Sequence, residues 1–368
     1  MSGSRLLPST RQLDSGVLPT QRWNKVAMKV PLIAISGLAT APAEVLSPDG
    51  KPCFGRFAGA ADFVDWSGLA APYARSRLWR HFHHKRWQYL ALSTEQLFCG
   101  IAIVDVGWTN AAFAYAFDRV LQTEVAAYSQ HGVPGLSASI GDRPASGAAS
   151  HFRFLHHRID YRQLAGSACY QLRLRCGEFE IDAEFDAAAA APLLLAVGCV
   201  EGGSVHATQK SSGMPLTGEV RVRGKSYDLQ GGVASFDYSN GLLARETAWR
   251  SASAHDLHLG FNLRAGYFGG QENALWLDGE LFPLGNAQFD FKPNDPLAAW
   301  HIRTDDGLLD LQLQPEGVRR EVKNLLIASS RYVQSIGSFS GWVKPTRQAP
   351  PRLVRRLVGV AEDHRSRW

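Results

Sequence analysis

Short runs of alternating apolar and polar residues recur along the chain from Arg86 onward. The first three runs are WQYLALST, LFCGIAIVDVGW and AAFAYAFD, which are rich in aromatic and β-branched residues and are joined by brief links. Alternation with a period of two is typical of half-buried β-strands, because successive side chains point to opposite faces. These runs predict an antiparallel meander that ends near Asp118.

The same pattern returns after a Gly-, Pro- and Ser-rich break at residues 129–150, which predicts a loop. Strands are predicted at HFRFLHHRID, at YQLRLR and EFEIDAEF around Cys176-Gly177, and at LTGEVRVR and SYDLQ around Gly224-Lys225. The stretch AAAAAPLLLAVGCV fits a short helix or a buried strand equally well. No convincing amphipathic helix longer than three turns is present.

Two Asp-Gly pairs mark further turns: ALWLDG turns at Asp278-Gly279, and HIRT turns through Asp306-Gly307 into LLDLQLQ. Asp-Gly suits a type I′ turn, in which both central residues need positive φ, and this turn matches the twist of antiparallel strands. The C-terminal half is therefore predicted to be an antiparallel sheet as well.

The length of 368 residues exceeds the size to which a single hydrophobic core usually grows. Many short strands must close or stack to bury their edges. We expect an all-β chain with a flexible arm at 1–50 and two closed or nearly closed barrels at 51–205 and 206–368. A single large β-sandwich is the alternative.

Charge and cysteine content narrow the class of protein. The net charge of +5 is confined to the C-terminal basic segment 344–367, so we expect no nucleic-acid partner. The longest apolar stretch is too short to span a membrane. Five cysteines without a C-x-x-C pair favour a reducing, cytoplasmic location. Export is the alternative if translation starts at Met28, because VPLIAISGLATA then resembles a short signal peptide. The oligomeric state stays open.

Sequence motifs for several kinds of chemistry are missing. Glycine-rich nucleotide fingerprints, H-E-x-x-H and G-x-S-x-G do not occur, so we expect no cofactor and neither a metalloprotease nor a serine hydrolase. His81 and His83 share one face if they lie on a strand and could then hold a metal with a carboxylate. Both this segment and His151–His157 are mixed with Arg and Lys, which favours a solvated strand edge and no metal site.

Several blocks occur in an order that carries a family resemblance: RWQYLALSTEQLFCGIAIVDVGW, DYSNGLLARETAWRSASA, GFNLRAG, ENALWLDG and GVAEDHRSRW. The chain resembles the bacterial family catalogued as domain of unknown function 2804 over residues 50–368. That family is distantly similar to carotenoid hydratases, tocopherol cyclases and lipocalin-like Diels–Alderases. The resemblance implies two tandem lipocalin-like (calycin) antiparallel β-barrels and apolar, often unsaturated ligands.

The densest group of candidate chemistry lies between Ser235 and Asn273. Asp237 matches in position the acidic residue of the hydratase-like relatives, within GGVASFD, although Tyr-Ser-Asn-Gly follows it where those relatives have a Glu–Trp pair. A carboxyl group buried among aromatic rings can act as a proton donor. The predicted catalytic residues are Asp237 and Glu272. The predicted ligand-binding residues are Tyr238, Arg245, Trp249, Asn262, Asn273 and Trp276.

Each of these residues also has a structural interpretation. Asp237 can pair with Arg245 at a turn, the tryptophans can fill a core, and Glu272-Asn273 can cap a hairpin. The C-terminal Glu362, Asp363, His364 and Trp368 also fall in a family block, and a terminal strand that closes a barrel explains them equally well.

The hypothesis that follows is a barrel cavity that binds a small apolar ligand of lipid, prenyl or polyene type, with cofactor-independent, acid-catalysed hydration, cyclisation or isomerisation. A carrier without catalysis is the first alternative and predicts a few, internally satisfied polar groups in the cavity. A structural or interaction module is the second and predicts a filled interior with an exposed apolar patch.

Overall fold

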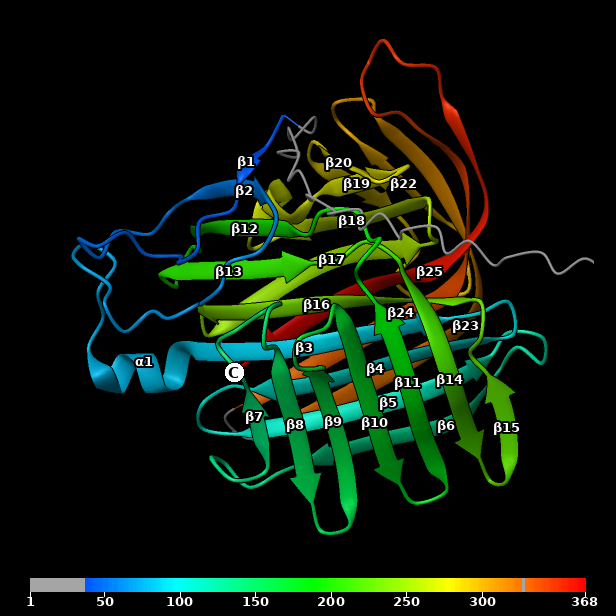
Figure 1. Ribbon diagram of the computed structural model, residues 1–368, viewed down its shortest axis with the longest axis horizontal. Coiled ribbons are helices and arrows are strands. Elements are labelled where there is room, and N and C mark those ends of the chain that lie inside the picture. Colours follow the sequence, from blue (N-terminus) through cyan, green and yellow to red (C-terminus); the bar gives the residue numbers. More distant parts are fainter. Residues whose placement is uncertain (1–36, 326–327) are drawn as a thin grey trace, which may run out of the picture. The chain divides into compact units, whose positions relative to one another are not determined.

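The structure is a computed structural model, and it describes residues 37–325 and 328–368. Two mainly antiparallel sheets contain nearly all of the regular secondary structure in this part of the chain (Figure 1). Its helices are α1 (Arg77–His83) and a 3₁₀ helix (Gly269–Glu272). The prediction of an all-β fold is confirmed.

Strands β1–β16 form the first sheet and β17–β25 form the second. The first sheet comprises β1 (Ala39–Thr40), β2 (Gly55–Ala58), β3 (His84–Ser93), β4 (Leu97–Asp105), β5 (Asn110–Asp118), β6 (Thr123–His131), β7 (Ala138–Ile140), β8 (Ala149–Phe154), β9 (His157–Gln163), β10 (Cys169–Cys176), β11 (Phe179–Asp186), β12 (Leu194–Cys199), β13 (Val205–Lys210), β14 (Met214–Val222), β15 (Lys225–Asp228) and β16 (Gly232–Leu242). The second comprises β17 (Glu246–His255), β18 (Leu259–Gly266), β19 (Ala274–Leu277), β20 (Glu280–Pro283), β21 (Ala287–Asp290), β22 (Trp300–Thr304), β23 (Leu309–Leu325), β24 (Ala328–Val343) and β25 (Arg352–Arg367).

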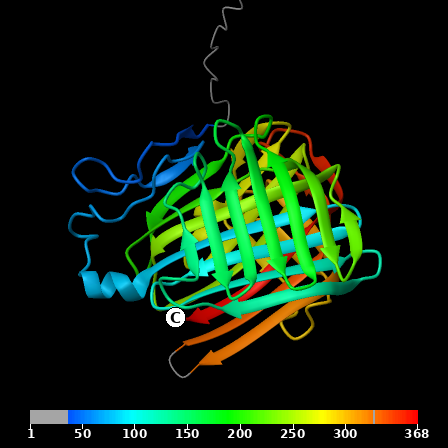
Figure 2. The ribbon, with the colours of Figure 1, turned by 60° about the horizontal axis from the view of Figure 1, so that its bottom comes forward.

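The long strand β16 connects the parts of the first sheet. One of its edges pairs with β3, which continues through β4 and β5 to β6. Its other edge pairs with β14 near Gly232 and with β13 near Asp237, so that the sheet branches there. The β14 branch runs through β11, β10, β9 and β8 to β7. Figures 1 and 2 show the green strands β8–β11 crossing over the cyan strands β3–β5.

The main hydrophobic core fills the space between these two layers. Leu90 of β3 and Ile101 of β4 lie in one cluster with Phe152 of β8, Leu172 of β10 and Ile181 of β11, and all five are buried. Even-numbered residues of β3 enter this core, so its odd-numbered residues face the other way. The interior of the first sheet is therefore filled with side chains.

The opposite face of β3–β5 packs against the second sheet. The Tyr115 hydroxyl on β5 donates a hydrogen bond to Gln334 on β24. Arg119 follows β5 and donates two hydrogen bonds to the carboxylate of Glu316 on β23, at 2.8 and 2.9 Å. The Arg119 side chain is only 8% exposed, so this bidentate pair joins the sheets within a largely buried interface.

Most of the predicted strands are confirmed. The three runs of the first meander form β3, β4 and β5, and the hairpin around Cys176-Gly177 forms β10 and β11. Asp278 and Gly279 have φ angles of 50° and 88°, as the predicted type I′ turn requires. The break at 129–150 is mainly loop, with the end of β6 and the short β7 inside it.

Other elements differ from the prediction. The run HFRFLHHRID is not one strand, because the chain turns at Leu155, where φ is 55°, and forms β8 and β9. The undecided stretch contains strand β12, which pairs with β13 and β2. At Asp306-Gly307 only the glycine has positive φ, because residues 305–308 form a four-residue loop between β22 and β23.

Closure into two barrels is not visible in the pairing of the described strands. The edge strands β6 and β7 do not pair with each other, nor do β20 and β21. The chain passes from one sheet to the other between Leu242 and Glu246, whereas the predicted domain boundary is at residues 205 and 206. Calycin barrels and this boundary stay predictions. Most of the predicted arm, with Met28, lies outside the described residues. Among those described, no helix is long and apolar enough to cross a membrane.

Candidate functional site

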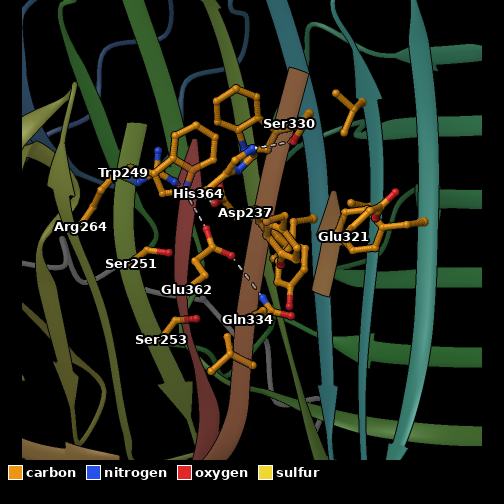
Figure 3. A pocket seen from close by; sticks show the side chains of 18 of the residues that line it. Asp237, Trp249, Ser251, Ser253, Arg264, Glu321, Ser330, Gln334, Glu362 and His364 are labelled. Atoms are coloured by element: carbon orange, nitrogen blue, oxygen red, sulfur yellow. Dashed lines mark hydrogen bonds and ion pairs between the residues drawn. The ribbon is translucent and has the colours of Figure 1, made fainter. Parts of the chain in front are cut away.

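A cavity of about 230 Å³ lies between the two sheets, on the face of β3–β5 that points away from the main core (Figure 3). We call it the inter-sheet cavity. Trp87 and Tyr89 of β3 border it on one side, with Asp237 of β16, and Trp249 of β17 and Glu362 of β25 border it on the other. The sequence predicted a cavity inside a barrel. The interior of the first sheet is filled, and the open space lies between the sheets instead.

Aromatic rings form much of the wall. Trp87 and Trp249 face each other nearly parallel, with ring centroids 6.1 Å apart and an angle of 13° between the planes. Phe113 of β5 and Tyr332 of β24 lie 5.8 Å apart across the same interface. Trp368 also lines the cavity, with its ring centroid 6.3 Å from that of His364. Such a wall suits a flat, unsaturated ligand, because aromatic faces stack on π-systems and attract positive charge.

Polar side chains interrupt this aromatic wall, so the cavity is not simply apolar. Ser251 and Ser253 of β17 point into it beside Trp249, since residues two apart share one face of a strand (Figure 3). Ser330 and Gln334 of β24 also line it, from the same sheet on the other side of β25. The cavity wall therefore offers both aromatic faces and hydrogen-bonding groups.

A buried group of two cations and two carboxylates supports one end of the cavity. We call Lys210, Asp237, Arg264 and Glu272 the charge cluster. Lys210 forms ion pairs with both Asp237 and Glu272, and its distance to Glu272 is 2.8 Å. Arg264 lies 3.2 Å from Glu272 and 3.9 Å from Asp237. The formal charges cancel, which is the condition for burying ions at tolerable cost.

Exposure differs sharply within the charge cluster. The side chain of Glu272 is 0% exposed and those of Lys210 and Arg264 are 3% and 4% exposed, whereas that of Asp237 is 20% exposed. Of the two carboxylates in the charge cluster, Asp237 is therefore the one that reaches the cavity. Asp237 can accept a hydrogen bond from a ligand or balance a developing positive charge.

Arg264 joins the charge cluster to the aromatic wall. Its guanidinium carbon lies 5.1 Å from the centroid of the Trp249 ring, and its Nη1 donates to the Tyr267 hydroxyl at 3.2 Å. Burial lowers the pKa of Arg264, but Glu272, Tyr267 and Asp237 outweigh burial, so the pKa rises. Arg264 is thus a permanent cation that fixes the plane of Trp249.

Glu362 is a further carboxyl group that lines the cavity. It accepts a hydrogen bond from the Trp249 indole Nε1 at 2.7 Å and one from the Gln334 amide at 3.3 Å (Figure 3). No ion pair with a cation is formed by Glu362 among the described residues, in contrast to Asp237. Two neutral donors, the indole and the amide, fix the position of this carboxyl group.

Two buried histidines complete the polar lining. Burial lowers the pKa of His255 to about 3, and burial together with the Arg264 charge lowers the pKa of His364 to about 3. Both rings are therefore neutral at pH 7. The His364 Nε2 bonds to Ser366 and Ser330, at 2.6 and 3.3 Å, and its ring centroid lies 4.0 Å from that of Trp249.

Three of the predicted site residues line the cavity: Asp237, Trp249 and Asn262. Glu272 lies behind the wall and reaches the cavity only through Lys210 and Asp237. The Asn262 side chain donates to the backbone carbonyl of Glu272 at 2.9 Å, which ties β18 to the 3₁₀ helix. The structure thus brings both predicted catalytic carboxylates into one cluster.

The other predicted ligand-binding residues lie elsewhere. Trp276 is buried in a separate small cluster, and its indole donates to the Pro192 carbonyl at 2.8 Å. The Tyr238 side chain belongs to the main core, because it faces away from its neighbour Asp237 on β16. Arg245 lies between the two sheets in sequence, and its carbonyl accepts a hydrogen bond from Trp368.

Asn273 has a structural position next to the charge cluster. Its side-chain oxygen accepts from the Arg264 backbone N–H at 2.6 Å, and its amide donates to the Gly285 carbonyl at 2.7 Å. This agrees with the alternative that Glu272-Asn273 organises a turn. The Asp237–Arg245 pair of that alternative is replaced by the pairs of Asp237 with Lys210 and Arg264.

Four important residues were not among the predicted ones: Lys210, Arg264, Glu362 and His364. Glu362 and His364 are two residues apart in the C-terminal block, so they share a face if this block is a strand. That spacing was the sequence signal that could have identified them. Arg264 lies within GFNLRAG. Lys210 carries no local signal, because only the pairing of β13 with β16 places it opposite Asp237.

The metal hypothesis at His81 and His83 has no support in the structure. These residues lie in α1, and His83 stacks on Trp79 with ring centroids 3.8 Å apart. Its Nδ1 contacts the carbonyl oxygen of Leu243 at 2.6 Å. In the described part of the chain, no group of three or more His, Cys, Asp and Glu side chains is arranged to hold a metal ion.

Comparison with known proteins gives a family and a fold. Residues 38–368 match one family model, described as Domain of unknown function (DUF2804). No functionally curated protein matches the sequence. The solved structure of CghA with Sch210972 is similar, with a TM-score of 0.52 and 10% sequence identity over 89% of this chain and 97% of that chain. At this identity the likeness shows the fold alone.

Weaker likenesses extend to two further proteins. Kievitone hydratase from Nectria haematococca gives a TM-score of 0.47 at 10% identity, over 88% of this chain and 98% of that chain. A protein assigned as AttH from Nitrosomonas europaea gives 0.45 at 12% identity, over 81% and 96%.

Proposed function

This chain belongs to the DUF2804 family, and from its inter-sheet cavity we propose that it binds an unsaturated, ring-bearing small molecule and protonates it without a cofactor. The reaction class is hydration, cyclisation or isomerisation of a carbon–carbon double bond. The observation that carries the proposal is Glu362, a carboxyl group that faces the cavity between neutral donors and aromatic rings.

The size of the cavity limits its occupant. A dry cavity of about 150 Å³ accommodates benzene, so a cavity of about 230 Å³ accommodates roughly ten non-hydrogen atoms, such as two fused rings. Exposed His131 and partly exposed Lys323 lie at its rim, so a longer ligand extends past them toward solvent. A ring system that carries a hydroxyl or carboxyl group fits this lining better than an entirely apolar chain.

Glu362 is assigned as the proton donor. Its carboxyl proton is transferred to one alkene carbon, and the electron pair of the double bond forms the new C–H bond, which leaves a carbocation on the other carbon. The faces of Trp87 and Trp249 stabilise this cation, at about 0.5–2 kcal/mol per ring. The carboxylate of Asp237 adds an attractive negative charge at the same end of the cavity.

The cation then reacts in one of three balanced ways. Water adds to it and releases a proton, or an adjacent carbon loses a proton. Alternatively, a second double bond of the ligand attacks the cation and closes a ring, and the new cation then loses a proton. Neutral His364 and His255 line the cavity and are in the form that accepts a proton. The proton returns to Glu362 through solvent, so the protein is regenerated.

The predicted catalytic pair acquires different roles in this proposal. Asp237 contacts the ligand and stabilises charge. Glu272 acts as a positioning residue, because it holds Lys210 and Arg264 and is itself withdrawn from the cavity. The carrier alternative is less favoured, because the cavity wall contains groups that a simple carrier does not require: a carboxyl group without an ion-pair partner among the described residues, and neutral imidazoles.

Proton transfer to carbon can be tested before the substrate is known. Dialysed protein is incubated in D₂O with a small-molecule extract of its own host, and mass spectrometry follows the gain of carbon-bound deuterium. Glu362 exchanges its proton with solvent, so the wild-type protein labels at least one compound. Glu362→Gln keeps the size of the side chain and is expected to lower labelling by about 10²–10⁴-fold.

Asp363→Asn is the matched control, because Asp363 lies next to Glu362 on β25 but points to the other face and pairs with Arg250. Equal labelling by Glu362→Gln and wild type contradicts the assignment of the donor. Compounds that bind the protein and never acquire deuterium identify a carrier instead.

A further inference from the structure

The short helix α1 has one anchored face and two faces in solvent. Its N-terminus is capped by Ser76, whose side chain accepts from the Trp79 N–H. The Trp79 and His83 rings stack on each other, and His83 bonds to Leu243. These contacts attach one side of the helix to the first sheet. None of the helix residues is fully buried.

Large apolar side chains are exposed on another side of helix α1. Leu78 is 71% exposed and Phe82 is 50% exposed, although apolar side chains of this size are usually buried. They are four residues apart, so they lie side by side on the helix surface. Two adjacent exposed apolar side chains form a patch that needs an explanation.

Cationic side chains border this patch. Arg77, Arg80 and His81 line an open groove with His84, and Arg75 precedes the helix. Within the described residues, none of the three arginines forms an ion pair with a carboxylate. The helix therefore presents uncompensated positive charge beside an apolar patch, which is the pattern of helices that lie in a membrane interface.

The helix continues directly into a strand that lines the inter-sheet cavity. The helix ends at His83 and β3 begins at His84, so the cavity residue Trp87 follows the helix by four residues. The His81 carbonyl packs against Gly107 in the β4–β5 loop, where a Cβ would lie only 2.3 Å from the oxygen and where φ is 82°. This loop follows Val104, which also lines the cavity.

We propose that α1 docks this protein on the surface of an anionic phospholipid bilayer. Leu78 and Phe82 enter the boundary between headgroups and acyl chains, and the arginines contact lipid phosphates. Docking places the cavity end near Trp87 at the membrane surface, where sparingly soluble unsaturated compounds concentrate. That last step rests on the proposed function, whereas docking itself does not.

The test is co-sedimentation of the full chain with vesicles of 70% phosphatidylcholine and 30% phosphatidylglycerol, and with vesicles of phosphatidylcholine alone. Wild type is expected to bind the mixed vesicles and to lose binding as salt is raised. Leu78→Ser/Phe82→Ser and Arg77→Ser/Arg80→Ser are each expected to weaken binding by about tenfold or more.

Two control variants remove the same kinds of side chain, apolar or cationic, from other parts of the surface. Val120→Ser/Leu121→Ser removes exposed apolar side chains after β5, and Arg352→Ser/Arg355→Ser removes exposed charge from the C-terminal basic segment. Both are expected to bind like wild type. Equal binding of wild type to both kinds of vesicle, or unchanged binding of the two α1 variants, overturns the proposal.

Deuterium labelling in solution separates this proposal from the proposed function. Leu78→Ser/Phe82→Ser is expected to label a dispersed substrate at the wild-type rate, because neither side chain lines the cavity. Loss of vesicle binding with intact labelling supports docking. Vesicle binding by a protein that labels nothing supports docking and contradicts only the catalytic assignment.

Discussion

The indole N–H of Trp249 donates to the carboxylate of Glu362 across the β17–β25 pair, at 2.7 Å. Trp249 lies directly opposite His364 in this pair, so Glu362 is its diagonal neighbour on the same face. The antiparallel register therefore places the side chains of Trp249, Glu362 and His364 next to one another on the cavity face. A change to the indole nitrogen alters the orientation of Glu362 without changing the backbone.

Trp249→Phe is predicted to lower the deuterium-labelling rate by about tenfold or more, because Glu362 loses its shorter hydrogen bond while an aromatic ring still faces Arg264. Binding of the labelled compound, measured by titration, should change less than the rate. Trp276→Phe is the control, since that indole donates to Pro192 outside the cavity. A larger loss of rate in Trp276→Phe contradicts the assignment.

Lys210→Met is predicted to destabilise the fold by about 3–5 kcal/mol, because the buried Glu272 and the partly buried Asp237 then share the single cation Arg264. The double variant Lys210→Met/Glu272→Gln should recover a large part of this loss, since one excess negative charge is removed with the positive one. Urea unfolding measures both values. Glu272→Gln alone supplies the second single-variant value. If the loss in the double variant equals the sum of the losses in Lys210→Met and Glu272→Gln, charge coupling within the cluster is contradicted.

Acid should destabilise the protein through its buried histidines. The pKa of His255 and of His364 is lowered from 6.5 to about 3, so below pH 6.5 the unfolded chain binds protons that the folded protein does not. Stability is complete above pH 6.5 and falls as the pH drops toward 3. Each ring should contribute a loss of about 3 kcal/mol between pH 6.5 and about pH 4.

The histidine variants His255→Gln and His364→Gln should therefore flatten the dependence of the unfolding free energy on pH in this range. Exposed His258→Gln is the comparison. A wild-type slope that persists in His255→Gln/His364→Gln assigns the acid sensitivity to other groups.

Lys85 should be a second pH-dependent element of the fold. Its side chain is fully buried, donates to the Phe82 carbonyl at 3.1 Å and lies 5.4 Å from the Trp368 ring, and burial lowers its pKa from 10.5 to about 8. Below pH 8 the buried charge is present and costs stability. Lys85→Met is predicted to raise the unfolding free energy at pH 7 by about 2 kcal/mol, after the lost hydrogen bond is subtracted.

The advantage of Lys85→Met should shrink above pH 8 and vanish near pH 10.5. In that window the unfolded chain binds more protons than the folded wild type, so wild-type stability rises with pH. Exposed Lys292→Met should show no such trend. Equal stability of Lys85→Met and wild type at pH 7 contradicts a charged, buried Lys85.

Local sequence determined the strands and several turns, because alternation and turn chemistry act between neighbours in the chain. The runs around Leu90 and Ile101 alternate, and they form β3 and β4. Asp278-Gly279 adopts the predicted turn, because few other residue pairs tolerate two positive φ angles. The same rule was insufficient at Leu155, where a residue without turn propensity changes direction because β8 and β9 pair.

Tertiary pairing decided the site. Trp249 and Trp276 have the same local character, yet the first lines the cavity and the second fills a small cluster. The reason is that β17 faces β3 there, whereas β19 packs against β2 and β12. Lys210 reaches Asp237 only because β13 and β16 are adjacent. The sequence by itself determined an all-β chain and a region rich in candidate catalytic and ligand-binding residues. Only the packing of two sheets decided which of those side chains share a cavity, because charges and rings interact through space and not along the chain.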